Sequence, residues 1–329
     1  MNKISAKFAA AVTAAVLSCS FTGCSQGRLS SAPEKIDVIC TTFSEYDWTR
    51  QIVGDSKNVE ITYLLGNGVD LHNYQPSAED IMKISDCDMF VYVGGESDKW
   101  VDDALREARN KDMQVVKLLE SIGDFAKEEE IKEGMEAEEE EEEEEGEEEG
   151  PEYDEHVWLS LRNAEICCDD ICNALCKLDS AGAEGYKANL AAYNAELDAL
   201  DSEYTDMADN AKVKTIVFGD RFPFRYLVDD YGIDYYAAFV GCSAETEASF
   251  ETIVGLANKI DELGIDTVFT IENSDPSIAQ AVIDNSQNKD RRIETLNSIQ
   301  SVTADTVSSG VTYISIMRQN LETLRKVLD

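Results

Sequence analysis

The chain contains only two histidines, His72 and His156, among 329 residues. His72 lies in GNGVDLHNYQPSAEDI (66–81), and His156 lies in EYDEHVWLS (152–160). Imidazole nitrogens are common ligands of zinc and other divalent transition metals. If the fold brings these two distant side chains together, they could hold one such ion between them.

Three further residues, whose side chains could supply oxygen ligands, each follow a predicted strand in the second half of the chain. They are Asp220, Glu272 and Asn297, after the runs 215–219, 266–271 and 292–296. His72 follows a predicted strand at 59–65, and His156 opens a helix. Ligands of open α/β sheets bind beyond the carboxyl ends of the strands, so we expect all five residues to converge on one cleft. A histidine beside a turn is also often structural, so the residues alone leave the metal interpretation open.

Apolar, β-branched runs alternate with amphipathic stretches in both halves of the chain, which predicts parallel sheets with helical crossovers. The predicted strands are 36–42, 59–65, 88–95, 113–119, 215–220, 233–239, 266–273 and 292–298. The predicted helices include one that starts at SAEDIMKI (77–84), with Ser77 as its N-cap and Asp80 three residues on, and one over RFPFRYLVDDYG (221–232). The expected fold class is α/β, with two similar lobes that each hold a parallel sheet flanked by helices. A long rigid helix at 186–211 joins the lobes, which span 36–185 and 212–329, and the metal cleft lies between them.

The N-terminus has the pattern of a secretory leader. Two lysines precede a short apolar stretch at 8–18, which is too short to span a membrane. The sequence Phe21-Thr22-Gly23-Cys24 resembles the lipobox of a bacterial lipoprotein, and Cys19 is a competing site. We expect a signal peptide at 1–23, lipidation of Cys24, a polar tether at 24–35, and an extracytoplasmic protein anchored to the bacterial cell membrane.

The net charge of −39 would repel nucleic acids and anionic lipid surfaces, so neither is expected as a direct ligand. Residues 128–155 hold 19 acidic residues and one lysine, including eight consecutive glutamates at 138–145. Such a run cannot pack, which predicts an acidic disordered loop over 127–155. It could collect cations near the cleft, or it could be an insertion without a role.

Four of the nine cysteines recur at helical spacing in AEICCDDICNALCKL, namely Cys167, Cys168, Cys172 and Cys176. They could form a thiolate metal site, but no CxxC pair is present, and we favour small apolar side chains that pack a helix. Cys40 and Cys87 lie in or beside strand-like runs, and Cys242 follows a glycine.

Two motifs around the histidines carry a resemblance to a known family. GVDLHNYQPSAEDI is similar to G-x-x-P-H-x-Y-x-P-[ST]-x-x-D-I, and DEHVWLS is similar to D-x-H-x-W-[LM]-[DS]. SDKWVDDAL and the C-terminal GVTYISIMRQNLETL add support. The chain thus resembles the zinc/manganese substrate-binding lipoproteins of bacterial ABC transporters, the ZnuA/AdcA/TroA-like cluster A-I family, over roughly 36–329. The resemblance implies that His72 and His156 are the first and second metal ligands.

The family's third ligand position falls here on Arg221, and a guanidinium cannot bind a metal. Asp220 is the expected substitute, although it could instead pair with Arg221 or cap the next helix. The fourth position falls on Asn297, whose amide oxygen is a weaker ligand. Glu272 could bind the metal directly or orient an imidazole. Two imidazoles and few oxygen ligands favour Zn2+, with Mn2+ as the alternative.

The resemblance implies a monomeric protein that captures Zn2+ outside the membrane and delivers it to an ABC permease, touching the membrane only through its lipid anchor. The alternative is a surface adhesion protein of the same fold with a degenerate metal site. An enzyme is not expected. A zinc hydrolase needs an open metal position and a general base, and Glu272 could supply the base, but the sequence has no HExxH motif.

Overall fold

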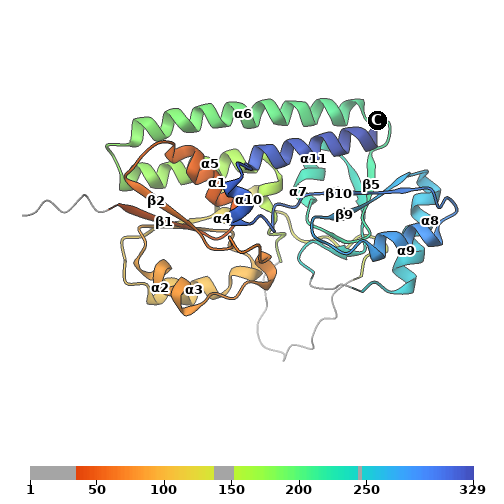
Figure 1. The fold of residues 1–329 in the computed structure, drawn as a ribbon, viewed down its shortest axis with the longest axis horizontal. Coiled ribbons are helices and arrows are strands. Elements are labelled where there is room, and N and C mark those ends of the chain that lie inside the picture. The colour runs from red at the N-terminus through yellow and green to blue at the C-terminus, as the bar shows by residue number, and fades with distance from the viewer. Residues whose placement is uncertain (1–34, 137–151, 244–246) are drawn as a thin grey trace, which may run out of the picture. The chain divides into compact units, whose positions relative to one another are not determined.

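The structure, a computed structural model, describes residues 35–136, 152–243 and 247–329 (Figure 1). The predicted signal peptide, Cys19, Cys24 and almost all of the tether lie outside the described residues. Residues 35–329 form one compact unit. Among the described helices, none is both long enough and apolar enough to cross a membrane.

The first half of this unit is built on a parallel sheet in the order β2-β1-β3-β4. The strands are β1 Ile36–Cys40, β2 Val59–Tyr63, β3 Met89–Tyr92 and β4 Gln114–Lys117. The helices of this half are α1 Phe43–Val53, α2 Ala78–Asp86, α3 Trp100–Glu107 and α4 Leu118–Ile122.

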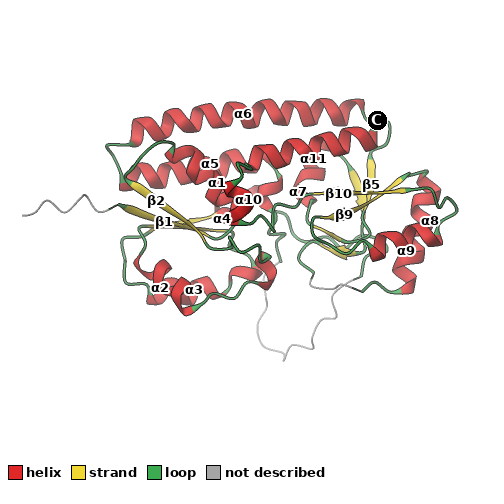
Figure 2. Ribbon diagram, viewed as in Figure 1, coloured by secondary structure: helices red, strands yellow, loops and turns green. Residues whose placement is uncertain are grey.

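Helices cover both faces of this sheet, with α2 and α3 on one face and α1 on the other (Figures 1 and 2). The alternation of side chains along β3 explains the two layers. Phe90 and Tyr92 join a core cluster with residues of α2 and α3, whereas Met89 and Val91 join the large core cluster that includes α1. Because both faces are buried, β3 reads as a continuous apolar run in the sequence.

The second half contains parallel strand pairs. The pairs are β5 Thr215–Val217 with β7 Asp234–Tyr236, β9 Thr267–Ile271 with β10 Arg292–Leu296, and the short β6 Arg221–Phe222 with β8 Phe239–Val240. A parallel bridge between Phe218 and Phe269 links β5 to β9. The helices are α7 Arg225–Tyr231, α8 Phe250–Leu263, α9 Ser277–Asn285, α10 Ala304–Ser308 and α11 Tyr313–Leu328.

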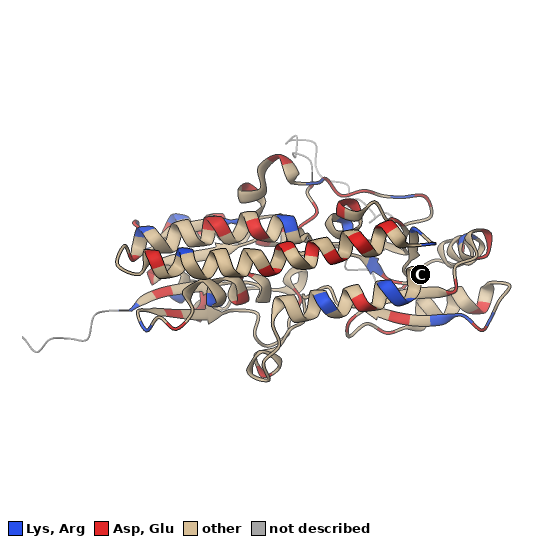
Figure 3. Cartoon of the chain, turned by 90° about the horizontal axis from the view of Figure 1, so that it is seen from above, with Lys and Arg blue, Asp and Glu red and all other residues tan. Residues whose placement is uncertain are grey.

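Two long helices, α5 Leu161–Leu178 and α6 Ala183–Asn210, connect the halves. Tyr193, Leu197, Leu200 and Tyr204 of α6 are buried at helical spacing. Asn189 near the start of α6 donates a hydrogen bond to the carbonyl of Ile52 in α1, and Tyr204 near its end donates to the carbonyl of Met317 in α11. The expected α/β class with a long connecting helix is confirmed. Figure 3 shows that the long helices carry many aspartates and glutamates.

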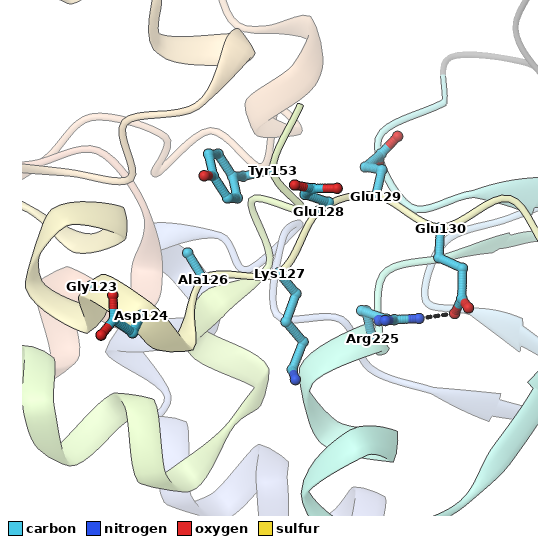
Figure 4. A pocket seen from close by; sticks show the side chains of 9 residues that line it. All are labelled: Gly123, Asp124, Ala126, Lys127, Glu128, Glu129, Glu130, Tyr153 and Arg225. Carbon is cyan, nitrogen blue, oxygen red and sulfur yellow. Dashed lines mark ion pairs between the residues drawn. The ribbon is translucent and has the colours of Figure 1, made fainter. Parts of the chain in front are cut away.

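Two parts of the chain differ from the sequence predictions. The predicted helix at 221–232 begins only at Arg225, because Pro223 interrupts it and Arg221–Phe222 pair as strand β6. The predicted disordered loop at 127–155 is wrong at both ends: Glu128 pairs with Tyr153 in an antiparallel bridge, and Glu136 pairs with Phe239. Glu130 also forms an ion pair with Arg225, and both line a pocket beside this segment (Figure 4). The run 138–145 lies outside the described residues.

Candidate metal centre

His72 lies on a single 3-10 turn, Leu71–Asn73, that follows the strand β2. Asp70 caps this turn, because its carboxylate accepts a hydrogen bond of 3.1 Å from the backbone N–H of His72. The imidazole Nδ1 lies 2.8 Å from Ser97 Oγ and 3.2 Å from Glu155 Oε2. The turn and these two partners hold the ring so that its other nitrogen, Nε2, faces the second histidine.

His156 is fully buried and opens the 3-10 turn Val157–Leu159. Asp154 Oδ1 accepts a hydrogen bond of 2.8 Å from its backbone N–H and lies 2.9 Å from its Nδ1. The ring packs against Trp158, with 5.3 Å between the ring centroids. His156 Nε2 lies 3.1 Å from His72 Nε2, so the structure brings the two histidines together as predicted.

The hydrogen bonds at Nδ1 determine the tautomers of both rings. Ser97 Oγ donates its hydrogen to Glu155 Oε2 over 2.6 Å, so it accepts from His72 Nδ1–H. The partner of His156 Nδ1 is a carboxylate, which can only accept. When neutral, each ring therefore carries its hydrogen on Nδ1 and presents a lone pair at Nε2. Two lone pairs face each other across 3.1 Å, an arrangement that a cation between them stabilises.

Acidic groups surround the two rings. Burial favours a higher pKa for Glu155. Hydrogen bonds from His72 and Ser97, together with the charge of His72, outweigh the effect of burial, so the pKa of Glu155 lies below its usual value. Burial favours a lower pKa for His156, but the carboxylate of Asp154 outweighs it and raises the pKa above its usual value. The raised pKa of His156 shows that the local field favours positive charge at this ring.

Cys242 completes the cluster of possible metal ligands. Its Sγ and one nitrogen of each imidazole all lie within 4.8 Å of one another, and no other group of three or more histidine, cysteine, aspartate or glutamate side chains is this close among the described residues. Loss of solvent around the thiol raises the Cys242 pKa well above its usual value, and the charges of Asp154 and Glu129 raise it further.

The other predicted ligands do not join this cluster. Asp220 accepts hydrogen bonds from the backbone N–H groups of Arg221, at 2.9 Å, and Ile271, at 3.1 Å. Glu272 accepts from the N–H and the hydroxyl of Ser298, at 2.6 and 2.9 Å. The amide oxygen of Asn297 accepts from Ile299 N–H at 2.8 Å. Their roles as metal ligands stay predictions, and their oxygens already connect the ends of strands and turns.

Arg221 and Gln300 form a network beside the histidines. Arg221 pairs with Asp70. The same carboxylate orients the amide of Gln300. When the amide nitrogen donates to Asp70 Oδ1 over 3.0 Å, the amide oxygen lies 3.2 Å from His156 Nε2. The opposite orientation would place the amide oxygen against a carboxylate, two acceptors in contact. In the chosen orientation the oxygen faces the lone pair of His156 Nε2, and a cation between these two acceptors would stabilise them.

A comparison with protein families identifies the fold's relatives. The model of the family described as ZnuA, zinc-uptake complex component A periplasmic, matches residues 38–327. The chain belongs to the ZnuA family. The family resemblance drawn from the two histidine motifs is thus confirmed, and the periplasmic description agrees with the expected extracytoplasmic location.

Several relatives of the ZnuA family are similar to nearly the whole chain. The zinc-binding lipoprotein AdcA of Streptococcus pneumoniae (TIGR4) is 31% identical over 329 residues, which cover all of this chain but 62% of AdcA. The high-affinity zinc uptake system protein ZnuA of Bacillus subtilis (strain 168) is 30% identical over 92% of this chain and 91% of that protein. The crystal structure of the Zn(II)-bound ZnuA-like domain of the pneumococcal AdcA has a TM-score of 0.69 at 28% identity, and covers 90% of this chain and 99% of that domain.

Sequence reasoning missed Cys242 and Gln300. Cys242 lies just beyond the carboxyl end of strand β8, and this position could have indicated a ligand. Gln300 had no comparable signal, because it lies four residues beyond β10 in an irregular turn. The cysteines of α5 behave as the packing interpretation expects: Cys167, Cys168 and Cys172 lie in the large core cluster.

Proposed function

We propose that this chain is the extracytoplasmic component of an ABC importer that binds Zn2+ between His72 and His156 and delivers it to a permease. The likeness to zinc-binding relatives and to a family described as a component of a zinc-uptake complex supports this function for the whole protein. The chain acts as a binding protein rather than an enzyme, and Zn2+ is its cargo.

One observation carries the proposal, the approach of the two Nε2 atoms to 3.1 Å. Two nitrogens bound to one zinc ion at about 2.0–2.1 Å in tetrahedral geometry lie about 3.3 Å apart. The two rings therefore have nearly the spacing that the ion requires. Carboxylates behind both rings orient them, as is usual for zinc-binding histidines.

The donors favour zinc over harder cations. Imidazole suits zinc, whereas manganese, calcium and magnesium favour sites rich in oxygen ligands. Asp154 and Glu155 each face the Nδ1 side of a ring, so they add negative charge behind the rings. They compensate part of the charge of a dication.

Isothermal titration calorimetry tests the binding site. After removal of bound ions with a chelator, the wild-type protein is expected to bind one Zn2+ tightly. His72→Ala and His156→Ala are each expected to weaken this binding by more than the roughly 100-fold that loss of a supporting residue causes. Asn73→Ala is the control, because Asn73 is an exposed neighbour of His72 on the same turn.

Unchanged tight binding in both histidine variants would contradict the proposal. Binding of a surface partner that survives chelation and both substitutions would favour the adhesion alternative instead. Turnover of ester or peptide substrates that is lost with the metal would contradict the assignment as a binding protein.

The same proposal includes a lipid anchor at Cys24. The lipobox-like sequence and the short apolar leader support it. Mass spectrometry of the N-terminal peptide from membranes is expected to find the acyl chains on Cys24. Acylation at Cys19, or an unmodified N-terminus released to the medium, would contradict this part.

A further inference from the structure

We propose that the thiolate of Cys242 is the third zinc ligand and that the amide oxygen of Gln300 is the fourth. This inference rests on the proposed function and specifies the metal that the site selects. Arg221 occupies the family's third ligand position and cannot bind a metal, and the sulfur of Cys242 would take over that role.

Cys242 has different surroundings from the other described cysteines. Those six are Cys40, Cys87, Cys167, Cys168, Cys172 and Cys176, and each lies in a buried hydrophobic cluster or packs against one. Cys242 belongs to none of the clusters. The neighbours of Cys242 are two imidazoles and the carboxylate of Glu129. This carboxylate accepts a 3.2 Å hydrogen bond from the backbone N–H of Cys242. Apolar packing therefore does not account for a cysteine here.

The backbone at Cys242 is held close to His156. A Cβ added to Gly241 would lie 3.1 Å from His156 Cε1 and 2.9 Å from the carbonyl oxygen of Phe222. Only a residue without a side chain permits this approach at 241 without displacement of its neighbours. The close approach places the next side chain, Cys242, beside both rings.

The distances suit a zinc ion. A sulfur at about 2.3 Å and a nitrogen at about 2.0–2.1 Å from the same tetrahedral zinc lie about 3.6 Å apart. The Cys242 sulfur and one nitrogen of each imidazole lie within 4.8 Å of one another. This limit exceeds the separation expected at a zinc ion by about 1 Å, so a movement of about that size would bring the sulfur into the zinc coordination sphere. Binding of the metal releases the thiol proton to solvent.

Gln300 supplies an oxygen from the opposite side of the network. Asp70 is paired with Arg221 and holds the amide nitrogen, so the amide oxygen is directed toward His156 Nε2. Gln300 is 5% exposed, so its side chain is largely shielded from solvent. Arg221 therefore contributes to the site indirectly, by fixing the carboxylate that orients Gln300.

A thiolate changes which metals the site accepts. Thiolate ligands favour zinc and other soft or borderline cations, and they bind manganese, calcium and magnesium poorly. We expect the site to reject Mn2+ even in excess.

Cobalt substitution tests the sulfur ligand directly. Under reducing conditions, Co2+ added to the metal-free protein is expected to give a thiolate-to-cobalt charge-transfer band in the near ultraviolet. Cys242→Ser is expected to abolish this band and to weaken Zn2+ binding at least about 10-fold. Cys176→Ser is the matched control and is expected to retain both, because Cys176 is also partly exposed but packs against the core. Gln300→Leu is expected to weaken zinc binding and keep the band.

X-ray absorption at the zinc edge of the wild-type protein gives a second, mutation-free measurement. One sulfur scatterer at about 2.3 Å supports the inference, and a coordination sphere of nitrogen and oxygen alone overturns it. This result is decisive even if Cys242→Ser fails to fold. Tight zinc binding without sulfur would leave the proposed function intact, whereas no tight zinc binding at all would contradict both.

Discussion

At the scale of single residues, the hydrogen bond at Nδ1 of each histidine determines whether Nε2 offers a lone pair to a metal. His72 Nδ1 reaches Glu155 through Ser97, and His156 Nδ1 reaches Asp154 directly. A buried ring without such a partner could rotate or carry its hydrogen on Nε2, and the lone pair would then be lost to the metal. The supporting carboxylates therefore determine how the rings present their lone pairs to the metal.

Substitution of Glu155 by glutamine tests this role. The uncharged amide keeps the size of the side chain but removes the charge that favours a cation at His72. We expect Glu155→Gln to weaken Zn2+ binding by about 10- to 100-fold, as outer partners of metal ligands do. Titration calorimetry measures the change. Glu96→Gln is the control, because Glu96 belongs to the same segment as Ser97 but pairs on the surface with Lys99. An equal loss in both variants would contradict a specific role for Glu155.

Which of these residues the sequence could reveal depends on how local their signal is. His72 and His156 each lie inside a short recognisable motif, so both were predicted. Ser97 begins SDKWVDDAL, a stretch recognised as support for the family resemblance but not as part of the site. Cys242 and Gln300 reach the site through long-range packing. Asp220 was chosen because it precedes Arg221, yet its carboxylate is used by the N–H groups of residues 221 and 271. Adjacent residues on an extended strand point to opposite sides, which a motif does not reveal.

At the scale of elements, periodicity predicted almost every strand and helix, since most main strands are rich in apolar or β-branched residues and the crossover helices are amphipathic. The start of α2 was also predicted, and the structure confirms the reciprocal capping by Ser77 and Asp80. The short α4 and α10, of five residues each, were missed because one turn of helix has too few residues to show a period. The pair β6 and β8 was missed because each has only two paired residues, joined across the fold.

Helix α1 contains a buried carboxyl group that makes stability depend on pH. Glu45 is fully buried, and one of its oxygens accepts from the hydroxyl of Thr41 and the N–H of Thr42. Burial raises its pKa from the model-compound value of 4.5 to about 8. Between these two values the folded state holds a proton that the unfolded state has lost. The contribution of Glu45 to stability is therefore complete below about pH 4.5 and is lost as the pH rises through about 8.

Glu45→Gln is expected to remove this part of the pH dependence. One proton corresponds to a slope of about 1.4 kcal/mol per pH unit in the free energy of unfolding, which is the upper limit for this group. Urea unfolding from about pH 5 to about pH 8, with a chelator present to exclude metal binding, measures it. Glu251→Gln is the control, because Glu251 lies in the first turn of α8 and is exposed. An unchanged slope in Glu45→Gln would show that Glu45 ionises normally in the folded protein.

At the scale of the whole molecule, the net charge of −39 surrounds a site that requires a dication. Nearly half of that charge lies between residues 128 and 155. The described ends of this segment run beside the metal centre, since Glu129 bonds to Cys242 N–H and Asp154 to His156. A concentration of negative charge near a binding site increases the rate at which cations arrive, and salt screens the effect.

Replacement of Glu138–Glu145 by glutamines separates the two interpretations of the acidic run. If the run collects cations, the association rate of Zn2+ at low salt is expected to fall about 10-fold or less, and the tight equilibrium site is expected to remain. Stopped-flow tryptophan fluorescence can follow the association, because Trp158 packs against His156. At high salt the two proteins should bind zinc at equal rates, since screening removes the effect of distant charges. Equal rates at low salt as well would mean that the glutamates have no part in zinc capture, and that the cleft alone accounts for it.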